Sequence, residues 1–305
     1  MLTAQQLEDR RHGIGGSDAG AVLGLNPYRT PLDVYREKTG EADPPDLDDV
    51  EAVRWGNLLE DTLAREYSTR TGHKVRRRNR AVVHPELPFI RANLDRTVDG
   101  ERKVLEIKTA GYWARKDWGP AGSDHVPDAY LAQVMHQMLA TGYREADLCV
   151  LIGGQEFRIY HLGFDQELAD LIVDKETWFW RECVEKRMPP PPTTFDDLKA
   201  LYPTDDGGIE VATPEILDAI AELKQLKEQG KEVDQRQQAL ELAIKAQMGD
   251  AATLTDEAGN TLATWKTQQS TRLDQKALKA EEPDTFERFQ TTSTMRVLRL
   301  KGGRP

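Results

Sequence analysis

The chain has 305 residues, of which 38% are hydrophobic, and its mean hydropathy is -0.64. No apolar run approaches the ~18 residues of a membrane-spanning helix, and the first residues lack the apolar stretch of a secretory signal. The two cysteines exclude a disulfide framework and a four-thiolate metal or cluster site. A net charge of -11 excludes a broadly basic surface, so a nucleic-acid site would have to be a local patch. We expect a cytoplasmic protein without a membrane segment.

In the first part of the chain, the predicted elements alternate between helices and strands. Ser17 is the expected N-cap of the first helix, and Asp99-Gly100 is the expected turn of a hairpin. The predicted helices cover residues 18–25, 32–38, 53–71, 127–141 and 166–186. The predicted strands cover residues 74–77, 81–84, 89–94, 103–109, 146–152 and 156–162. This order predicts an α/β (α+β) fold with a mixed central sheet flanked by helices.

A run of prolines at 189–192 marks the clearest break in the chain. Prolines cannot continue a preceding helix, and the Asp- and Gly-rich residues that follow have little to bury. The break predicts a first domain over residues 1–192, a linker over 193–212 and a C-terminal α+β extension over 213–305. We expect the extension to serve in partner docking or oligomerisation.

The extension begins with a helical pattern. Residues 213–215 have the order of an N-cap, a first-turn proline and a first-turn acid. Apolar residues then recur every three or four positions, which predicts one long amphipathic helix or a helical hairpin broken near Gly230. A β-hairpin with Asn260 near its turn follows, then a short helix capped by Asp274 and a last strand at 295–300.

Residues suited to chemistry gather around Asp95 and the strand Val-Leu-Glu-Ile-Lys, which holds Glu106 and Lys108. Alternate side chains of a strand share a face, so Glu106 and Lys108 project together. Across the hairpin, Asp95 can lie beside Glu106, and two converging carboxylates repel each other unless a cation lies between them. Oxygen ligands favour Mg²⁺ or Mn²⁺ over zinc. The alternative is a structural Glu–Lys ion pair, because short acidic patterns of this kind are common.

Other segments accompany this motif, including a helix with Gln133 and Gln137 one turn apart. In chain order the segments read IGGSDAGAVLGLNPYRTPLDVYREKTG, RWGNLLE, PFIRANLDRTV, VLEIKTA, PDAYLAQVMHQMLATG and VLIGGQEFRIYHL. Over roughly residues 10–187, this ordered set resembles the YqaJ-type viral recombinases, or lambda-type phage exonucleases. That family belongs to the PD-(D/E)xK superfamily. The resemblance implies a restriction-endonuclease-like sheet in the first domain, followed by the helical and β-hairpin extension.

The resemblance also implies roles for individual residues. The implied catalytic residues are Asp95, Glu106, Lys108, Gln133 and Glu60. The implied metal ligands are Asp95, Glu106 and the backbone carbonyl of Ile107, which would hold one or two Mg²⁺ ions that Mn²⁺ can replace. Ser17 corresponds to the position that binds a terminal 5′-phosphate, with Arg10 as its basic partner by spacing, although Arg11 is adjacent to it.

A dense basic run precedes the predicted hairpin. It consists of Lys74, Arg76, Arg77, Arg78 and Arg80. Such a run is either the solvated edge of a strand or a contact surface for the DNA backbone. The sequence alone does not decide between the two.

The function that the resemblance implies is digestion of one strand of duplex DNA, 5′ to 3′, from an end. The 3′ overhang would pass to a single-strand annealing protein in phage or prophage recombination. Lambda-type members form ring-like trimers, so the resemblance also implies a homo-oligomer. Two alternatives stay open: a DNA endonuclease of the same fold, and a catalytically inactive scaffold that binds DNA ends.

Overall fold

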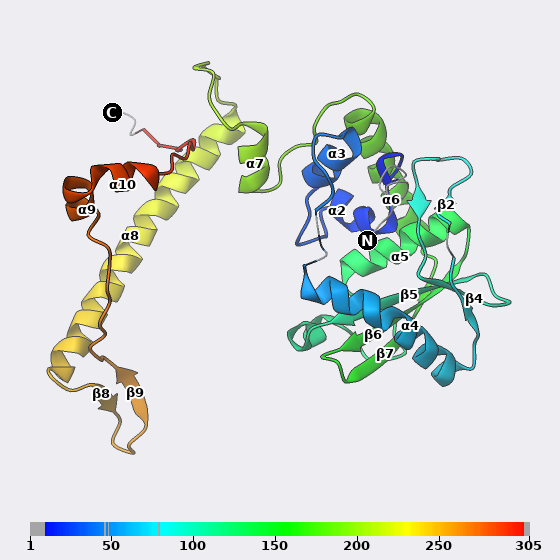
Figure 1. Ribbon diagram of the computed structural model, residues 1–305, viewed down its shortest axis with the longest axis horizontal. Coiled ribbons are helices and arrows are strands. Elements are labelled where there is room, and N and C mark those ends of the chain that lie inside the picture. Colours follow the sequence, from blue (N-terminus) through cyan, green and yellow to red (C-terminus); the bar gives the residue numbers. More distant parts are fainter. Residues whose placement is uncertain (1–9, 46, 48, 79, 302–305) are drawn as a thin grey trace. The chain divides into compact units, whose positions relative to one another are not determined.

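The computed structural model describes residues 10–301 apart from positions 46, 48 and 79. It divides into two compact units, Met1–Leu201 and Tyr202–Pro305 (Figure 1). The first unit includes α7 (Phe195–Leu201), a helix inside the stretch predicted as a linker. Asp197 of α7 accepts a hydrogen bond of 2.8 Å from the Thr30 hydroxyl. No helix among the described residues combines the length and the apolar character that crossing a membrane requires.

A five-stranded mixed sheet organises the first unit, with its strands in the order β1-β4-β5-β6-β7. Their bounds are Val75–Arg76 (β1), Arg96–Val98 (β4), Lys103–Ala110 (β5), Glu145–Ile152 (β6) and Glu156–Gly163 (β7). β5 and β6 pair in parallel, and the other neighbouring pairs are antiparallel. A separate antiparallel pair joins β2 (Val82–Val83) to β3 (Arg91–Ala92). The predicted mixed sheet is confirmed.

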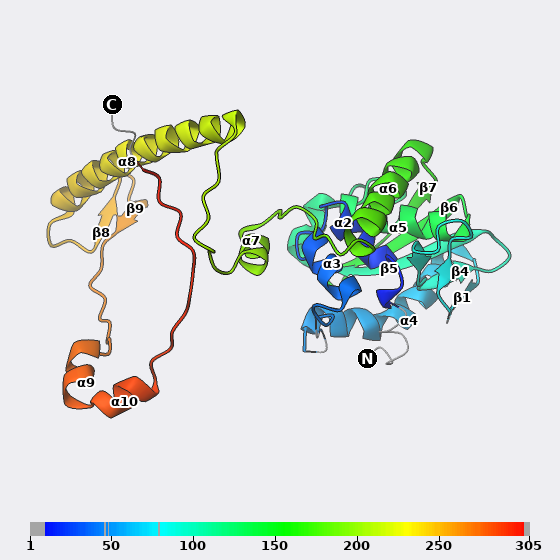
Figure 2. The same cartoon turned by 90° about the horizontal axis from the view of Figure 1, so that it is seen from above.

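Helices cover both faces of this sheet (Figures 1 and 2). Besides α7, the helices of this unit include α2 (Gly16–Val22), α3 (Pro31–Thr39), α4 (Glu51–Thr71), the 3₁₀ segment η1 (Tyr112–Asp117), α5 (Asp128–Thr141) and α6 (Gln166–Trp178). Of these, α4 and α5 pack directly on the sheet, and α2 packs on α5. The predicted helix over 166–186 changes to π-helical geometry after Trp178, in the segment η2 (Phe179–Val184). The predicted helices of this unit are therefore present, with shifted ends.

The central strand β5 separates two packing environments. Its Leu105 and Ile107 pack against Leu63 and Tyr67 of α4. Its Val104 faces the larger core, which includes the apolar residues of α5 and α6. Because side chains alternate along a strand, Glu106 projects to the face that α5 covers. The alternation read from the sequence thus decides which face of the sheet carries the charged groups.

Two predictions about local structure are wrong. Ser17 is not the N-cap of α2, because Gly15 takes that place and its N–H donates to Asp18 at 3.1 Å. Ser17 instead lies exposed in the first helical turn. Residues 295–300, predicted as a last strand, are irregular backbone. In the described part of the C-terminal unit, β8 and β9 form a two-stranded sheet that no third strand joins.

In the C-terminal unit, α8 runs unbroken from Pro214 to Met248, so the alternative of a helical hairpin near Gly230 is wrong. Asp274 caps the next helix as predicted, accepting from the N–H groups of Lys276 and Ala277 at 3.0 Å. The remaining elements are the hairpin of β8 (Thr253–Thr255) and β9 (Thr261–Thr264), then α9 (Gln275–Glu281) and α10 (Pro283–Arg288).

Candidate active site

The β4–β5 hairpin brings Asp95 to Glu106. The turn at Asp99-Gly100 has its glycine at φ +79°, and the register pairs Arg96 with Leu105. One step further along, Asp95 lies opposite Glu106. The Oδ2 atom of Asp95 accepts a hydrogen bond of 2.9 Å from the backbone N–H of Ile107. The side chain of Asp95 thus occupies the edge of β5 where β4 no longer pairs.

The carboxylate of Glu106 is held on both oxygens. Its Oε1 accepts from Gln133 Nε2 at 2.6 Å, and its Oε2 accepts from Gln137 Nε2 at 2.7 Å. Lys108 Nζ lies 2.6 Å from the same Oε1 and 5.1 Å from the centre of the Tyr130 ring. Residues three and four apart share one face of a helix, so α5 presents Tyr130 and both glutamines to β5. The geometry fixes the direction in which Glu106 points.

Two glycines within α2 let this helix lie close to Gln133 and Gln137. A Cβ atom on Gly16 would lie 3.3 Å from Gln137 Cγ and 3.4 Å from Gln133 Cγ. A Cβ on Gly20 would lie 3.3 Å from the carbonyl oxygen of Ala129 at the start of α5. Helix α2 therefore packs against α5 beside its two glutamines. This contact gives the Gly-Gly-Ser-Asp-Ala-Gly segment at residues 15–20 a packing role.

Charge is concentrated at this point of the sheet. Burial and then the negative charge of Glu106 raise the pKa of Asp95 to about 7, although Lys108 acts in the opposite direction. Burial alone would lower the pKa of Lys108, but Glu106 and Asp95 raise it, so Lys108 stays protonated. A single ammonium group faces two carboxylates. The cost of keeping both carboxylates ionised falls when a cation binds between them.

The donor set fits a hard divalent cation. The N–H and C=O of one strand residue point to the same side, so the Ile107 carbonyl shares the open edge of β5 with Asp95. Among the described residues, no three His, Cys, Asp or Glu side chains group closely enough to hold a metal by themselves. Two carboxylates and a carbonyl suit Mg²⁺, because this ion keeps several waters and takes its other oxygens from a phosphate.

Glu60 reaches the site from α4, but arginines already hold its carboxylate. Its Oε1 lies 2.5 Å from Arg96 Nη1 and 3.1 Å from Arg77 Nη2. Arg96 is buried and also donates to Asp61 and to the backbone carbonyl of Asp95. The charge of Glu60 contributes to the raised pKa of Asp95. Glu60 is therefore beside the metal-binding candidates, and Arg96 ties it to the strand that carries Asp95.

Arg10 lies in an ion-pair cluster at the start of the first unit. Its Nε lies 3.2 Å from Glu37 Oε1. Burial would raise the pKa of Asp18, but the surrounding cations outweigh it and hold that pKa far below its usual range. Asp18 has ion pairs with Lys38 at 2.7 Å, Arg29 at 2.8 Å and Arg10 at 3.5 Å. Arg10 thus lies beside Asp18, the immediate neighbour of Ser17, and its guanidinium is shared by two acids.

Two of the five residues in the basic run form ion pairs with acids of the same unit. Arg76 forms an ion pair with Asp99 at 2.7 Å, and Arg77 forms one with Glu60 at 3.1 Å. The other members of the run are exposed, namely Lys74, Arg78 and Arg80. Part of the positive charge that the sequence places here is therefore neutralised by acids of the same unit.

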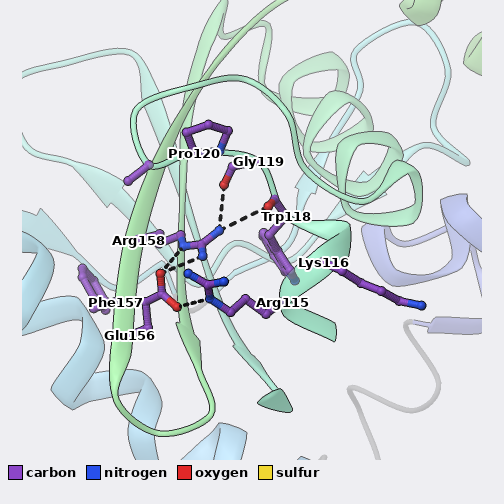
Figure 3. A pocket seen from close by; sticks show the side chains of 9 residues that line it. Arg115, Lys116, Trp118, Gly119, Pro120, Glu156, Phe157 and Arg158 are labelled. Atoms are coloured by element: carbon purple, nitrogen blue, oxygen red, sulfur yellow. Dashed lines mark hydrogen bonds and ion pairs between the residues drawn. The ribbon is translucent and has the colours of Figure 1, made fainter. Parts of the chain in front are cut away.

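A cavity of about 600 Å³ lies between η1 and β7 (Figure 3). Glu156 bridges Arg115 at 2.7 Å and Arg158 at 2.7 Å, and Arg158 also donates to the Trp118 carbonyl. The Trp118 ring stacks on Tyr130 with 5.5 Å between centroids. The candidate carboxylates do not line this cavity. Trp118, which does line it, stacks on Tyr130, the ring that lies beside Lys108.

Sequence reasoning assigned no role to three residues of this site. Gln137 could have been assigned, because it lies one helical turn from Gln133 and must share its face. Tyr130 lies one turn before Gln133 and carried the same signal. Arg96 had no sequence signal beyond its place after Asp95, because the acids that it binds come from a helix far earlier in the chain.

Comparison with known proteins places this chain in a family. Over 308 aligned residues the chain is 36% identical to "Uncharacterized protein YqaJ" of Bacillus subtilis (strain 168), covering 99% of this chain and 95% of that protein. The family model of the YqaJ-like viral recombinase domain matches residues 5–144. The chain belongs to the YqaJ-like viral recombinase family. The resemblance read from the sequence is confirmed.

Solved structures support the fold of this YqaJ-like chain. An alkaline exonuclease from Laribacter hongkongensis, LHK-Exo, aligns over 61% of this chain and 94% of its own, with a TM-score of 0.51 and 19% identity. LHK-Exo in complex with dAMP aligns over 65% and 97%, with a TM-score of 0.51 and 20% identity. At this identity the likeness shows a shared restriction-endonuclease-like fold, and the fold class predicted for the first domain is confirmed.

Proposed function

We propose that this chain is a Mg²⁺-dependent deoxyribonuclease that degrades one strand of duplex DNA from an end. The observation that carries the proposal is the arrangement at β5. Glu106 is oriented by hydrogen bonds from Gln133 and Gln137 and by the ammonium group of Lys108. Asp95 lies opposite, with its pKa raised to about 7. A structural ion pair would not need two carboxylates at one lysine. Membership of a viral recombinase family and the likeness to an alkaline exonuclease support the same chemistry.

The residues divide the work of phosphodiester hydrolysis. Asp95, Glu106 and the Ile107 carbonyl would hold Mg²⁺, which supplies a more acidic water and neutralises the phosphate when bound; Mn²⁺ would substitute. Lys108 offsets negative charge on the reacting phosphate and orients the attacking water. Gln133 keeps Glu106 in place through its Nε2, and its amide oxygen would accept a hydrogen bond from that water. Glu60 keeps the strand of Asp95 aligned through Arg96.

The proposed direction of digestion rests on the start of α2, which packs against the two glutamines of the site. Ser17 and Arg10 would receive the terminal 5′-phosphate, which makes the reaction 5′ to 3′ and leaves a 3′ overhang for a single-strand annealing protein. Arg10 lies among acids, so phosphate binding requires Arg10 to exchange part of its pairing with Glu37. The exposed cations of the basic run, Lys74, Arg78 and Arg80, would contact the DNA backbone.

The test compares linear duplex DNA, with and without a 5′-phosphate, with a closed circle. We expect Mg²⁺-dependent release of nucleotides from the phosphorylated linear duplex and no cutting of the circle. Rapid cutting of the circle would establish an endonuclease instead. Lys108→Ala should abolish hydrolysis and retain DNA binding, whereas Lys199→Ala, at an exposed position of α7, should change neither. Binding without hydrolysis by the wild type would favour an inactive scaffold.

A further inference from the structure

Helix α8 carries an apolar stripe that its own unit leaves uncovered. It extends over 35 residues, about 50 Å at the rise of an α-helix, and Met248 is its one buried residue among those described. The stripe consists of Ile216, Leu223, Leu226, Val233, Leu240 and Ile244. All but Leu223 are between 45% and 56% exposed. A helix of this length gains most of its stability by burying an apolar face, so α8 lacks its packing partner.

The spacing of the stripe is that of a coiled coil. Ile216 and Leu223 lie seven residues apart, and so do Leu226, Val233 and Leu240 in sequence. With Ile216 at an a position, the other a residues are Leu223, Gly230, Gln237 and Ile244, and Leu226, Val233 and Leu240 fall at d positions. Gly230 is the a position that contributes no side chain to the contact. A seven-residue repeat produces a left-handed supercoil of helices, and Ile at a with Leu at d favours two strands.

The charges beside the stripe match those of an identical helix laid parallel and in register. In that arrangement a g residue faces the e residue five positions later on the other helix. Glu222 would face Lys227, and Arg236 would face Glu241, so both contacts are between opposite charges. Gln237 falls at an a position, where two copies would meet and hydrogen-bond to each other. A polar residue at a single a position fixes the register of a coiled coil.

We propose that α8 binds the α8 helix of a second copy of this chain as a parallel, two-stranded, in-register coiled coil. The apolar stripe supplies the contact, and the flanking charges select an identical partner over an unrelated helix. The surface belongs to the C-terminal unit, and the proposal does not depend on the nuclease activity proposed for the first unit.

The experiment measures the mass of the full chain in solution by light scattering and sedimentation equilibrium. We expect two chains for the wild type and one chain for the double variant Leu226→Asp/Leu240→Asp. Leu242 is 70% exposed and falls at an f position on the outer side, so Leu242→Asp is the matched control and should keep two chains. A wild type with one chain or three chains, or a double variant that keeps the mass of two, would overturn the proposal.

Orientation and register have their own tests, again with the full chain. Glu222→Lys should weaken the association because it places two cations together, and adding Lys227→Glu should restore it. Ile216→Cys should form a disulfide between the two copies on oxidation, because only a parallel, in-register pair brings both copies of this terminal position together. Failure of the charge exchange to restore association, or absence of that disulfide in a two-chain species, would refute the parallel arrangement.

Discussion

Replacing Gln137 with leucine separates the support of Glu106 from the stability of the fold. Gln137 Nε2 donates to Glu106 Oε2, whereas Oε1 has two donors, Gln133 and Lys108. Among the described residues, no donor reaches the buried Oε1 atom of Gln137 itself. Gln137→Leu therefore removes one hydrogen bond to a carboxylate and, at the same time, one buried carbonyl group without a partner.

The two effects on stability have opposite signs. A hydrogen bond to a charged group contributes about 1.5–3 kcal/mol, and a buried polar atom without a partner costs about 1–3 kcal/mol. Their difference leaves the free energy of unfolding within about 2 kcal/mol of the wild type. The effect on function has no such compensation. Loss of a group that orients a metal-binding carboxylate lowers metal affinity or activity by about 10–100-fold.

The assay is a Mg²⁺ titration of nuclease activity, together with urea unfolding measured with and without Mg²⁺. We expect Gln137→Leu to need more Mg²⁺ for half-maximal activity and to gain less stability from Mg²⁺ than the wild type. Gln133→Leu is the matched comparison: its Mg²⁺ requirement should rise less, because Lys108 remains on the same oxygen, but its maximal activity should fall because Gln133 also contacts the attacking water. A Gln137→Leu variant with the Mg²⁺ dependence of the wild type would refute the assigned role of this glutamine.

Two further predictions concern stability. Burial would lower the pKa of His136, but the charge of Glu176 at 2.8 Å raises it above its ordinary 6.5. The pair therefore stabilises fully below about pH 6.5, and its contribution is lost as the pH rises through the raised pKa. The difference in unfolding free energy between wild type and His136→Asn should shrink in alkaline urea titrations. Gly13→Ala should lower the free energy of unfolding by about 1–3 kcal/mol, because its Cβ would lie 2.5 Å from the Phe89 carbonyl oxygen. Gly111→Ala is the control: its Cβ would have open space around it, so this variant should unfold like the wild type.

The parts of the site that the sequence revealed are those encoded by local periodicity. The alternation in Val-Leu-Glu-Ile-Lys placed Glu106 and Lys108 on one face, and Asp99-Gly100 marked the turn that brings Asp95 back to them. These relations depend on residues close in the chain, and strand geometry alone fixes them. The placement of Asp95 beside Glu106 therefore needed no knowledge of the rest of the fold.

The rest depends on contacts between distant segments. The guanidinium of Arg96 meets Glu60 from α4, a pairing that no spacing rule predicts. The N-cap of α2 went to Gly15 because Asp18, three residues on, accepts its N–H, and this reciprocal pattern competes with the more familiar serine cap at Ser17. At 295–300 the apolar and β-branched pattern favours a strand, but a strand forms only where another strand pairs with it.

The acidity of the chain also has a structural explanation. Several acids are buried with cations of the same unit: Asp18 with Lys38, and Glu176 with His136. These pairs cancel locally, so they add little to the field that an approaching DNA molecule would meet. At the site, Lys108 offsets only one of the two charges of Asp95 and Glu106, and a divalent cation would neutralise the excess. The negative net charge therefore does not oppose the proposed reaction, because binding of Mg²⁺ changes the sign of the site at the point where the phosphate must lie.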